Sequence, residues 1–527
     1  MTRLALLSTS DKTGLVPFAQ TLVEKYGFEI ISSGGTAATL QAANIPVTKV
    51  SDYTGAPEIL GGRVKTLHPK IHGGLLARRN LAADQADLAS QHIQPIDLVV
   101  VNLYPFEQTV QRQQEKGDTS SDQALIEAVE QIDIGGPTML RSAAKNFAHV
   151  TVLCTSHQYE AYLTELDQHQ GQVSLAFRKR CAMRVFERTA AYDQAIAAYL
   201  RQSEATSTDA ANLPEHLMIA GQAQQTLRYG ENPHQRAMWY QSAPRTGWSA
   251  AEQLQGKELS YNNLVDLEAA RRIIAEFCSD EESPTAAILK HNNPCGMAQA
   301  DTIAMAYRNA FAADSVSAFG GIVALNRPID ALTAQTMTQT FLECIVAPAC
   351  DPDAAEILQK KSNLRVLILP DLVTGQPITA KAIAGGWLVQ DADHWLTPPS
   401  DWDIVTDRRP DPAMLAEMSF AWRVVKHVKS NAIVVTRDRA TLGVGAGQMN
   451  RVGAAKIALE QAGDRAQGAV LASDGFFPFD DSVRTAAAAG IVAIVQPGGS
   501  IRDQESIVAA NELGVIMALT GTRHFLH

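Results

Sequence analysis

The first 200 residues alternate short apolar segments with amphipathic ones, and this order constrains the fold more than any other feature. Apolar runs at residues 4–8, 28–32 and 97–103 have the length of buried strands, and residues 13–26 and 37–43 have the composition of helices. A strand–helix–strand–helix order predicts an α/β fold with a parallel sheet covered by helices. In such a sheet, ligands bind beyond the carboxyl ends of the strands.

The length of the chain predicts more than one domain. A single hydrophobic core stops growing near ~250–300 residues, and this chain has 527. A long amphipathic helix is expected over residues 174–200, and the polar, aperiodic stretch that follows is typical of a linker. We therefore predict a first domain over residues 1–200, a linker over 201–212 and a second domain over 213–527.

The second half again mixes strands and helices and shows no repeat of fixed period. Two polar, proline-containing stretches, near 351–363 and 396–412, predict that it has two lobes. The strand-like segments are 286–289, 321–325, 365–369, 432–435, 469–472 and 491–495.

Charge and cysteine content exclude several classes of protein. The net charge of −11 does not favour binding to nucleic acid or to an anionic membrane. The longest apolar run, about ten residues, is too short to span a bilayer, and the first residues lack the apolar core of a signal peptide. Six scattered cysteines contain no CxxC pair, so neither a zinc site nor a disulfide framework is expected. We predict a cytoplasmic protein.

Two polar clusters follow the first two predicted strands. Residues 8–13 (STSDKT) and 33–36 (SGGT) combine hydroxyls, glycines and Lys12 at the start of a helix, an arrangement that suits an oxyanion such as phosphate. Neither matches the GxxxxGK[ST] loop of nucleoside triphosphate hydrolases. Taken alone, each cluster is a weak signal, and an ordinary helix cap is the more common explanation.

Two further segments of the first half are rich in glycine and charge. Residues 61–74 place Arg63, Lys65 and two histidines among glycines, although the histidines lack a carboxylate partner for a metal site. Residues 132–146 place Asp133 before a Gly-Gly turn and Lys145 about three helical turns further along. Asp133 can accept hydrogen bonds from a heterocyclic amide or can cap the helix. A surface loop with chance charges is the alternative for 61–74.

In the second half, Lys290 and His291 directly follow an apolar strand. Histidine acts as a base near neutral pH, and the adjacent ammonium can stabilise a developing oxyanion. A structural histidine beside a solvated lysine is the alternative. Segments 227–235, 317–321 and 473–481 also have the turn and polar residues of binding loops, and their phenylalanines suit either stacking or core packing. The GVGAG stretch at 443–447 lacks the GxGxxG pattern of a dinucleotide site.

Together these segments resemble the bifunctional purine-biosynthesis family that joins phosphoribosylaminoimidazolecarboxamide formyltransferase to IMP cyclohydrolase. The motifs occur in the order of the family and cover essentially the whole chain. They are SDKTGL, SGGT, GGRVKTLHP, NLYPF, IDIGGPTMLRSAAKN, LRYGENPHQ, KHNNPCG, AFGGIVALN, GVGAGQ and SDGFFPFDDSV.

The resemblance implies a fold, two reactions and a partner. Residues 1–200 would resemble methylglyoxal synthase and close the purine ring, and the remainder would form two cytidine-deaminase-like lobes that transfer a formyl group. The implied cosubstrate is 10-formyltetrahydrofolate, with no metal required; a bound monovalent cation stays open. It also implies a homodimer with formyl-transfer sites at the interface. The alternative is a single formyltransferase whose first half only senses nucleotides.

The resemblance also assigns residues to formyl transfer. His291 matches the general base that removes a proton from the poorly nucleophilic aromatic amine, and Lys290 matches the group that stabilises the tetrahedral intermediate. Glu343 stands where vertebrate members often have aspartate. Matching nucleotide positions are Arg228, Tyr229, Asn263, Phe319, Gly320, Glu343, Asn431, Phe476 and Arg523. Matching folate positions are Arg451, Asp481, Ser500 and Ile501.

For ring closure, Lys145 matches a proton donor and acceptor, with Asp133 and Tyr104 beside the reacting groups. Both reacting groups belong to one molecule, so orientation alone can contribute several kcal/mol, up to ~7–11. The implied nucleotide and phosphate contacts are Ser10, Asp11, Lys12, Ser33, Gly34, Gly35, Thr36, Arg63, Val64, Lys65, Thr66, Asn102 and Ile134.

Overall fold

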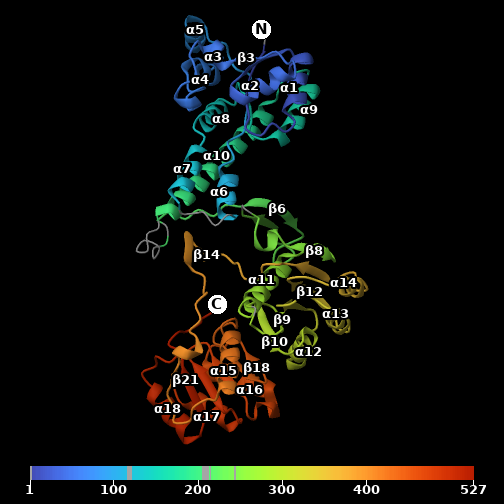
Figure 1. The fold of residues 1–527 in the computed structure, drawn as a ribbon, viewed down its shortest axis with the longest axis vertical. Coiled ribbons are helices and arrows are strands. Elements are labelled where there is room, and N and C mark those ends of the chain that lie inside the picture. Colours follow the sequence, from blue (N-terminus) through green and yellow to red (C-terminus); the bar gives the residue numbers. More distant parts are fainter. Residues whose placement is uncertain (1–2, 116–120, 205–212, 214, 243–244, 280) are drawn as a thin grey trace. The chain divides into compact units, whose positions relative to one another are not determined.

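The computed structural model of the chain describes residues 3–115, 121–204, 213, 215–242, 245–279 and 281–527 (Figure 1). The chain divides into two compact units, Met1–Ala220 and Gly221–His527. Each unit is described below by itself.

The first unit contains the predicted parallel sheet. Its five strands lie in the order β3-β2-β1-β4-β5, and every pairing is parallel. The strands are β1 (Arg3–Ser8), β2 (Phe28–Ser32), β3 (Thr48–Lys49), β4 (Leu98–Val101) and β5 (Thr151–Leu153). β1 and β4 are buried along their length because helices cover both faces, which explains their nearly continuous apolar sequences.

Helices α1 (Leu15–Glu24), α2 (Gly34–Ala42), α8 (Gly135–Lys145) and α10 (Leu175–Glu204) contribute to the same core. The last of these, α10, packs against α8 and β5. Of the face predicted for α10, Phe177, Cys181, Val185, Tyr192 and Tyr199 are buried.

The predicted linker is wrong at its start. Helix α10 continues through residues 201–204, so it consumes the first four residues of the stretch 201–212. Arginine, glutamine and glutamate have good helix propensity, and polarity alone therefore does not end a helix that is already formed. Residues 205–212 of the predicted linker lie outside the described residues.

The second unit is built on one mixed sheet of twelve strands, in the order β16-β21-β20-β19-β17-β18-β10-β9-β11-β12-β13-β8. Two lobes meet at its centre, where β10 (Asn293–Gln299) pairs antiparallel with β18 (Ala440–Gly445). The predicted pair of lobes is thus present, but the lobes share a sheet. In Figure 1 the first lobe is green to yellow and the second orange to red.

The two lobes have the same order of elements although their sequences show no repeat. The first lobe runs α11 (Tyr261–Ala275), β9 (Thr285–Lys290), β10, α12 (Ile303–Ala313), β11 (Gly321–Leu325), α13 (Ala331–Met337), β12 (Leu342–Ala347), α14 (Pro352–Gln359) and β13 (Arg365–Ile368). The second runs α15 (Pro412–Val425), β17 (Ile433–Arg437), β18, α16 (Arg451–Ala462), β19 (Val470–Ser473), α17 (Asp481–Ala488), β20 (Ala493–Gln496), α18 (Asp503–Glu512) and β21 (Ile516–Leu519).

Shorter strands complete this unit. β8 (Glu252–Gln255) and β16 (Asp403–Ile404) form the two ends of the large sheet, and two separate hairpins pair β6 (Gln222–Leu227) with β7 (Ala237–Gln241) and β14 (Ile378–Ile383) with β15 (Gly386–Asp391).

Three cores hold the second unit together. One lies under α11 and α15 and is shared by both lobes, and each lobe has its own core on the other face of the sheet. On that face, glycines let α12 and α16 approach the sheet closely. A Cβ added to Gly296 would lie 1.9 Å from the carbonyl oxygen of Ala310, and one added to Gly443 would lie 1.9 Å from that of Ala458. The GVGAG stretch therefore serves helix packing rather than a dinucleotide.

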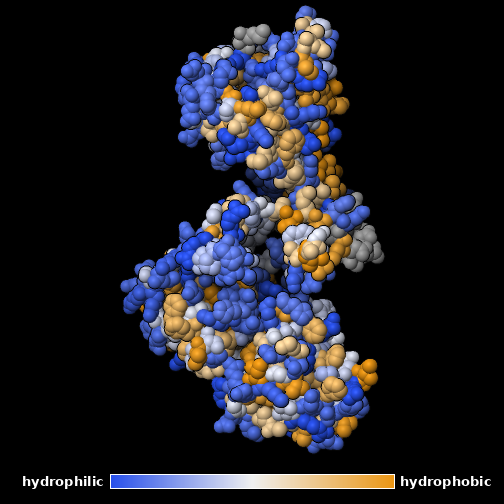
Figure 2. Space-filling model, turned by 180° about the vertical axis from the view of Figure 1, so that it is seen from behind, coloured by the Kyte–Doolittle hydropathy of each residue, from blue (hydrophilic) through white to orange (hydrophobic). Residues whose placement is uncertain are grey.

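Among the described residues, no helix combines the length and the apolar character needed to cross a membrane. Figure 2 shows hydrophilic residues over most of the visible face, with hydrophobic residues in separate patches.

A buried charge cluster joins the ends of α11 and α15, and it predicts acid sensitivity. Glu276 Oε1 lies 2.7 Å from Lys426 Nζ and 3.1 Å from His427 Nε2. Burial would raise the pKa of Glu276, but hydrogen bonds and charges from His427 and Lys426 outweigh it and lower the pKa from 4.5 to about 2. The stabilisation is complete above pH 4.5 and is lost as the pH falls toward 2, amounting to about 3 kcal/mol.

We expect Glu276→Gln to reduce the loss of unfolding free energy between pH 4.5 and 2, measured by urea unfolding at a series of pH values. The exposed Glu512, which pairs with Arg484 at 3.4 Å, supplies the control substitution to glutamine. An equally steep acid dependence in Glu276→Gln and in the parent protein would refute this account of the cluster.

Candidate active sites

In the first unit, polar loops follow the carboxyl ends of β1, β2 and β4, as the parallel sheet predicts. Side chains tie these loops to one another. Thr36 Oγ1 accepts the N–H of Thr9 and donates to its carbonyl, both at 2.9 Å. Asn102 Oδ1 accepts the N–H groups of Ser10 and Asp11, and Asn102 Nδ2 donates to the carbonyl of Asp11 at 2.7 Å. The three loops therefore form one surface.

Two ammonium groups flank the start of α2. A Cβ added to Gly34 would lie 3.3 Å from Lys65 Nζ, and one added to Gly35 would lie 3.7 Å from Lys12 Nζ. Gly34 has a φ of +51°, a conformation that glycine adopts without strain. Lys65 also forms an ion pair with Glu58 at 3.5 Å. Two cations beside the free N–H groups of a helix N-terminus suit a phosphate.

A second helix N-terminus, that of α8, lies against Thr66. A Cβ added to Gly135 would lie 2.9 Å from Thr66 Oγ1. Asp133 caps this helix, accepting the N–H of Gly136 at 2.8 Å. Burial raises the pKa of Asp133, although the N–H groups of Gly136, Tyr104 and Gly135 act in the opposite direction. Capping, one of the two predicted roles of Asp133, is thus present.

Tyr192 of α10 also holds the backbone of Asp133 in place. Its hydroxyl accepts the N–H of Asp133 at 2.9 Å and donates to the carbonyl of Gln131 at 3.0 Å. Nothing in the sequence connects residues 59 positions apart, so only the fold identifies this support.

Other predicted residues of this unit have different partners or are exposed. Arg63 pairs with Glu130, and both side chains are more than half exposed. Val64 pairs with Ile59 in an isolated bridge, and the side chain of Ile134 is exposed. Lys145 is exposed at the last residue of α8. With a rise of 1.5 Å per residue, it lies about 15 Å along the helix from the end that Asp133 caps.

In the second unit, sheet topology places the predicted residues at one edge. β9, β19, β20 and β21 run in one direction, and β11, β12, β13 and β17 run in the other. Lys290 ends β9, and the segments of Phe476, Ser500 and Arg523 follow β19, β20 and β21. Gly320 precedes β11, Glu343 is the second residue of β12, and Asn431 lies two residues before β17. We call this edge of the twelve-stranded sheet the ligand edge.

The predicted catalytic pair occupies the hairpin between β9 and β10. Lys290 Nζ donates to the carbonyls of Phe319 and Gly320, at 2.9 and 3.0 Å. His291 and Asn292 form the turn, with φ values of +52° and +65°. Asn293 Oδ1 accepts the N–H of Lys429 at 3.0 Å and so connects this turn to the second lobe, two residues before Asn431.

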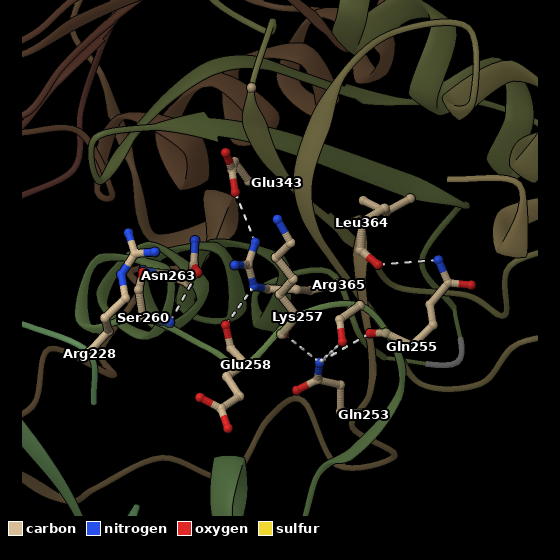
Figure 3. A network of polar contacts seen from close by, with 12 residues as sticks. Arg228, Gln253, Gln255, Lys257, Glu258, Ser260, Asn263, Glu343, Leu364 and Arg365 are labelled. Atoms are coloured by element: carbon tan, nitrogen blue, oxygen red, sulfur yellow. Dashed lines mark hydrogen bonds and ion pairs between the residues drawn. The ribbon is translucent and has the colours of Figure 1, made fainter. Parts of the chain in front are cut away.

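Arg365, at the start of β13, contacts residues near the predicted nucleotide positions, although no site role was predicted for it. Figure 3 shows its guanidinium between Glu343 and Glu258. Nη1 donates to Glu343 Oε2 at 2.9 Å and Nε to the carbonyl of Glu258 at 3.0 Å. The chain then enters α11, where Ser260 and Asn263 cap each other through their side chains and backbone. The sequence signal that could have identified Arg365 is an arginine at the start of an apolar strand.

The loop that carries Arg228 and Tyr229 reaches the same helix start. Asn262 Nδ2 donates to the carbonyl of Glu231 at 3.3 Å. The Arg228 guanidinium lies 4.6 Å from the centre of the Tyr229 ring, and its Nη2 donates to the Tyr229 hydroxyl at 2.7 Å. Arg228 is exposed and has no carboxylate partner among the described residues, so its charge is available for a phosphate.

In the second lobe, Arg451 is buried and holds other candidates. It pairs with the fully buried Asp474, donates to Ser473 Oγ at 3.0 Å and donates to Asn431 Oδ1 at 2.8 Å. Asp474, which belongs to the predicted binding loop 473–481, also accepts the N–H of Ala432 at 3.1 Å and the hydroxyl of Ser430. This arginine supports Asn431 in the structure, and its predicted folate contact stays a prediction.

The phenylalanines of these loops divide between the two predicted roles. Phe319 is 61% exposed and Phe476 is 37% exposed, whereas Phe477 is fully buried. Arg523 is exposed over the ring of Phe525, 4.6 Å from its centre. Exposed rings and an exposed guanidinium at the ligand edge suit a flat, anionic ligand.

The remaining folate candidates lie in loops at the ligand edge. Asp481 begins α17, where its own carboxylate accepts the N–H of Ser482 at 2.7 Å. Ser500 and the fully exposed Ile501 lie between β20 and α18, and Asp503 accepts the N–H of Ser500 at 3.1 Å. Among the described residues, no group of three or more histidine, cysteine or acidic side chains is placed to hold a metal ion.

Comparison with known proteins identifies the family. The sequence signature described as AICARFT/IMPCHase bienzyme matches residues 143–461, and that of the MGS-like domain matches residues 14–138. The bifunctional purine biosynthesis protein PurH of Acaryochloris marina is 70% identical to this chain over the full length of both. The chain belongs to the AICARFT/IMPCHase bienzyme family.

Other members of the bienzyme family are nearly as similar. The PurH proteins of Cyanothece sp. and Synechococcus elongatus are 64% and 65% identical, again over the full length of both chains. A solved structure titled "Crystal structure of ForH" is 34% identical over 39% of this chain and all of its own, with a TM-score of 0.35. The predicted family and the predicted α/β fold of both halves are confirmed.

Proposed function

We propose that the two units of the chain divide two consecutive reactions between them. As a member of the bienzyme family, the chain is a bifunctional enzyme that carries out the last two steps of purine biosynthesis, formyl transfer to aminoimidazole carboxamide ribotide and closure of the ring to IMP. The first unit closes the ring and the second transfers the formyl group. The observation that carries this division is that each unit has its own separate set of basic side chains and candidate proton-transfer groups.

In formyl transfer, the ribotide and 10-formyltetrahydrofolate meet at the ligand edge. His291 removes a proton from the amine as its nitrogen attacks the formyl carbon, and Lys290 stabilises the negative charge on the tetrahedral intermediate. The intermediate then collapses with cleavage of the bond between the formyl carbon and N10, and tetrahydrofolate leaves with a proton on N10. Arg228 and Arg523 bind the phosphate. Arg365 aligns Glu343 and the α11 start with the nucleotide, while Asp481 and the Ser500–Ile501 backbone bind the folate.

In ring closure, the cradle of the first unit binds the same phosphate through Lys12, Lys65 and the N-terminus of α2. Asp133 and Tyr104 then orient the carboxamide toward the formamide carbonyl, and water is lost. Orientation of the two groups is the main contribution to the rate of ring closure, because both reacting groups belong to one molecule.

Lys145 completes this site from a second copy of the chain. Within one chain it lies at the opposite end of α8 from Asp133, too far along the helix to share a ligand atom with it. This geometry supports the proposed homodimer, which also completes the formyl-transfer sites. We place the enzyme in the cytoplasm and assign it no resident metal.

The test supplies purified full-length protein with the carboxamide ribotide and 10-formyltetrahydrofolate, and separately with the formylated nucleotide alone. We expect IMP in both reactions. If only the first substrate pair is converted, and only as far as the formylated nucleotide, the first unit is a nucleotide sensor and the division of labour proposed here is wrong.

A further inference from the structure

Asp266, on the second turn of α11, directs its carboxylate at the hairpin turn that carries His291. Its Oδ1 accepts the backbone N–H of Asn292 at 2.8 Å. With the side-chain amide of Asn292 oriented to satisfy both of its polar atoms, Nδ2 donates to the same oxygen at 2.9 Å. One carboxylate oxygen thus receives two hydrogen bonds from the residue next to the predicted base.

The turn requires support from outside itself. His291 and Asn292 both have left-handed backbone conformations, with φ values of +52° and +65°. Asparagine and histidine adopt this conformation more often than most residues, but it is strained for any residue that carries a Cβ. Strained turns of this kind persist where the surrounding structure holds them. Two contacts do so here: Asp266 on one side, and on the other the N–H of Lys429, which Asn293 accepts.

The charge of Asp266 is directed at the same turn. Burial raises the pKa of Asp266, while the N–H of Asn292 and the charges of His291 and Lys290 act in the opposite direction. Asp266 has no ion-pair partner within the described part of the chain. A half-buried carboxylate without an ion pair contributes little to stability by charge, so its contact with the turn is what distinguishes it.

We propose that Asp266 is a positioning residue for formyl transfer, which holds the His291–Asn292 turn so that His291 stays beside Lys290 at the ligand edge. This inference rests on the proposed function of the second unit. It adds a residue of α11 to a site otherwise formed by the β9–β10 hairpin and loops.

The test compares Asp266→Ala and Asp266→Asn in the full-length enzyme. Formyl transfer is measured with the carboxamide ribotide and 10-formyltetrahydrofolate, and cyclisation with the formylated nucleotide. Asp266→Ala should lower kcat for formyl transfer at least about tenfold, because a misplaced base loses its alignment, with little change in KM. Asp266→Asn keeps an oxygen that accepts the N–H of Asn292 and should retain kcat within about threefold of the parent enzyme. Cyclisation should be unchanged in both.

Asp330→Ala is the matched control. Asp330 caps α13 by accepting the N–H of Thr333 at 2.7 Å, and it follows β11, at the edge of the sheet opposite the ligand edge. Its loss removes a comparable hydrogen bond and should leave both activities unchanged. If Asp266→Ala does not fold, Asp266→Glu, whose carboxylate is displaced by one methylene, should show the same fall in kcat.

An unchanged kcat in Asp266→Ala, or a fall equal to that in Asp330→Ala, would overturn the inference and leave Asp266 a structural residue. A change confined to KM would also overturn it. Absence of formyl transfer in the parent enzyme would instead refute the proposed function, so the two failures are distinguishable.

Discussion

Replacement of His291 by alanine is expected to lower the rate of formyl transfer by about 10²–10⁴-fold, the usual contribution of a general base. The amine that attacks the formyl carbon is a poor nucleophile because its lone pair is delocalised into the ring and the carboxamide. Removal of its proton during attack therefore matters more than it would for an alkyl amine. His291 stands in a turn at the ligand edge, beside Lys290, whose ammonium is held by two carbonyl oxygens.

The same variant should cyclise supplied formylated nucleotide at the rate of the parent enzyme, because the proposed site of ring closure lies in the first unit. Lys145→Ala should show the reverse pattern, with cyclisation lost and formyl transfer kept. Both rates are measured separately on purified protein. Loss of both activities in either variant would contradict separate sites.

Replacement of Asp474 by asparagine is expected to destabilise the second unit by about 3–5 kcal/mol, the range for breaking a buried ion pair. The side chains of Asp474 and Arg451 are 0% and 6% exposed, so the substitution leaves a cation without its counter-charge in the interior. The hydrogen bonds from Ala432 and Ser430 are also weakened. The side chain of Asn431 should also lose its alignment, because Arg451 holds it by a hydrogen bond.

Urea unfolding followed together with the two activities measures this effect. Formyl transfer should disappear at lower urea than in the parent protein, while cyclisation should persist to the same concentration. Asp480→Asn is the control: Asp480 pairs with Arg484 at 2.6 Å near the surface, and its loss should cost under about 1 kcal/mol. Equal effects of the two substitutions would show that the buried pair has no special role in stability.

Many strands of the second unit were predictable from an apolar run flanked by polar turns, although β12 and β21 were not predicted. The segment 321–325 coincides with β11, and five other predicted segments overlap β9, β13, β17, β19 and β20 by at least three residues. β10 and β18 were missed because glycine, asparagine and threonine interrupt them. The equivalence of the two lobes was also missed, because similar packing needs similar volumes and patterns rather than identical residues.

The candidate sites were predictable as motifs but not as arrangements. Lys290, His291, Lys12 and Lys65 stand in conspicuous polar loops, so their chemistry was apparent from residue type. Tyr192, Asp266 and Arg365 were not, because their contacts join positions many residues apart and their sequence surroundings resemble those of ordinary core or surface residues. Asp474 stands in a predicted loop, but its burial and its partners were not apparent.

The sequence by itself determined the family, the α/β class, the two-part organisation and the loops that carry the chemistry, because composition and local pattern depend on neighbours along the chain. Only the tertiary structure decided which loops meet. The antiparallel pairing of β10 with β18 turns the second lobe over, so that the amino ends of β11 and β12 and the carboxyl ends of β19, β20 and β21 share one edge. It also separated Lys145 from Asp133 by the length of α8. Hydrogen bonding between strands and the rigid rise of a helix set these distances, and neither is expressed in the order of residues alone.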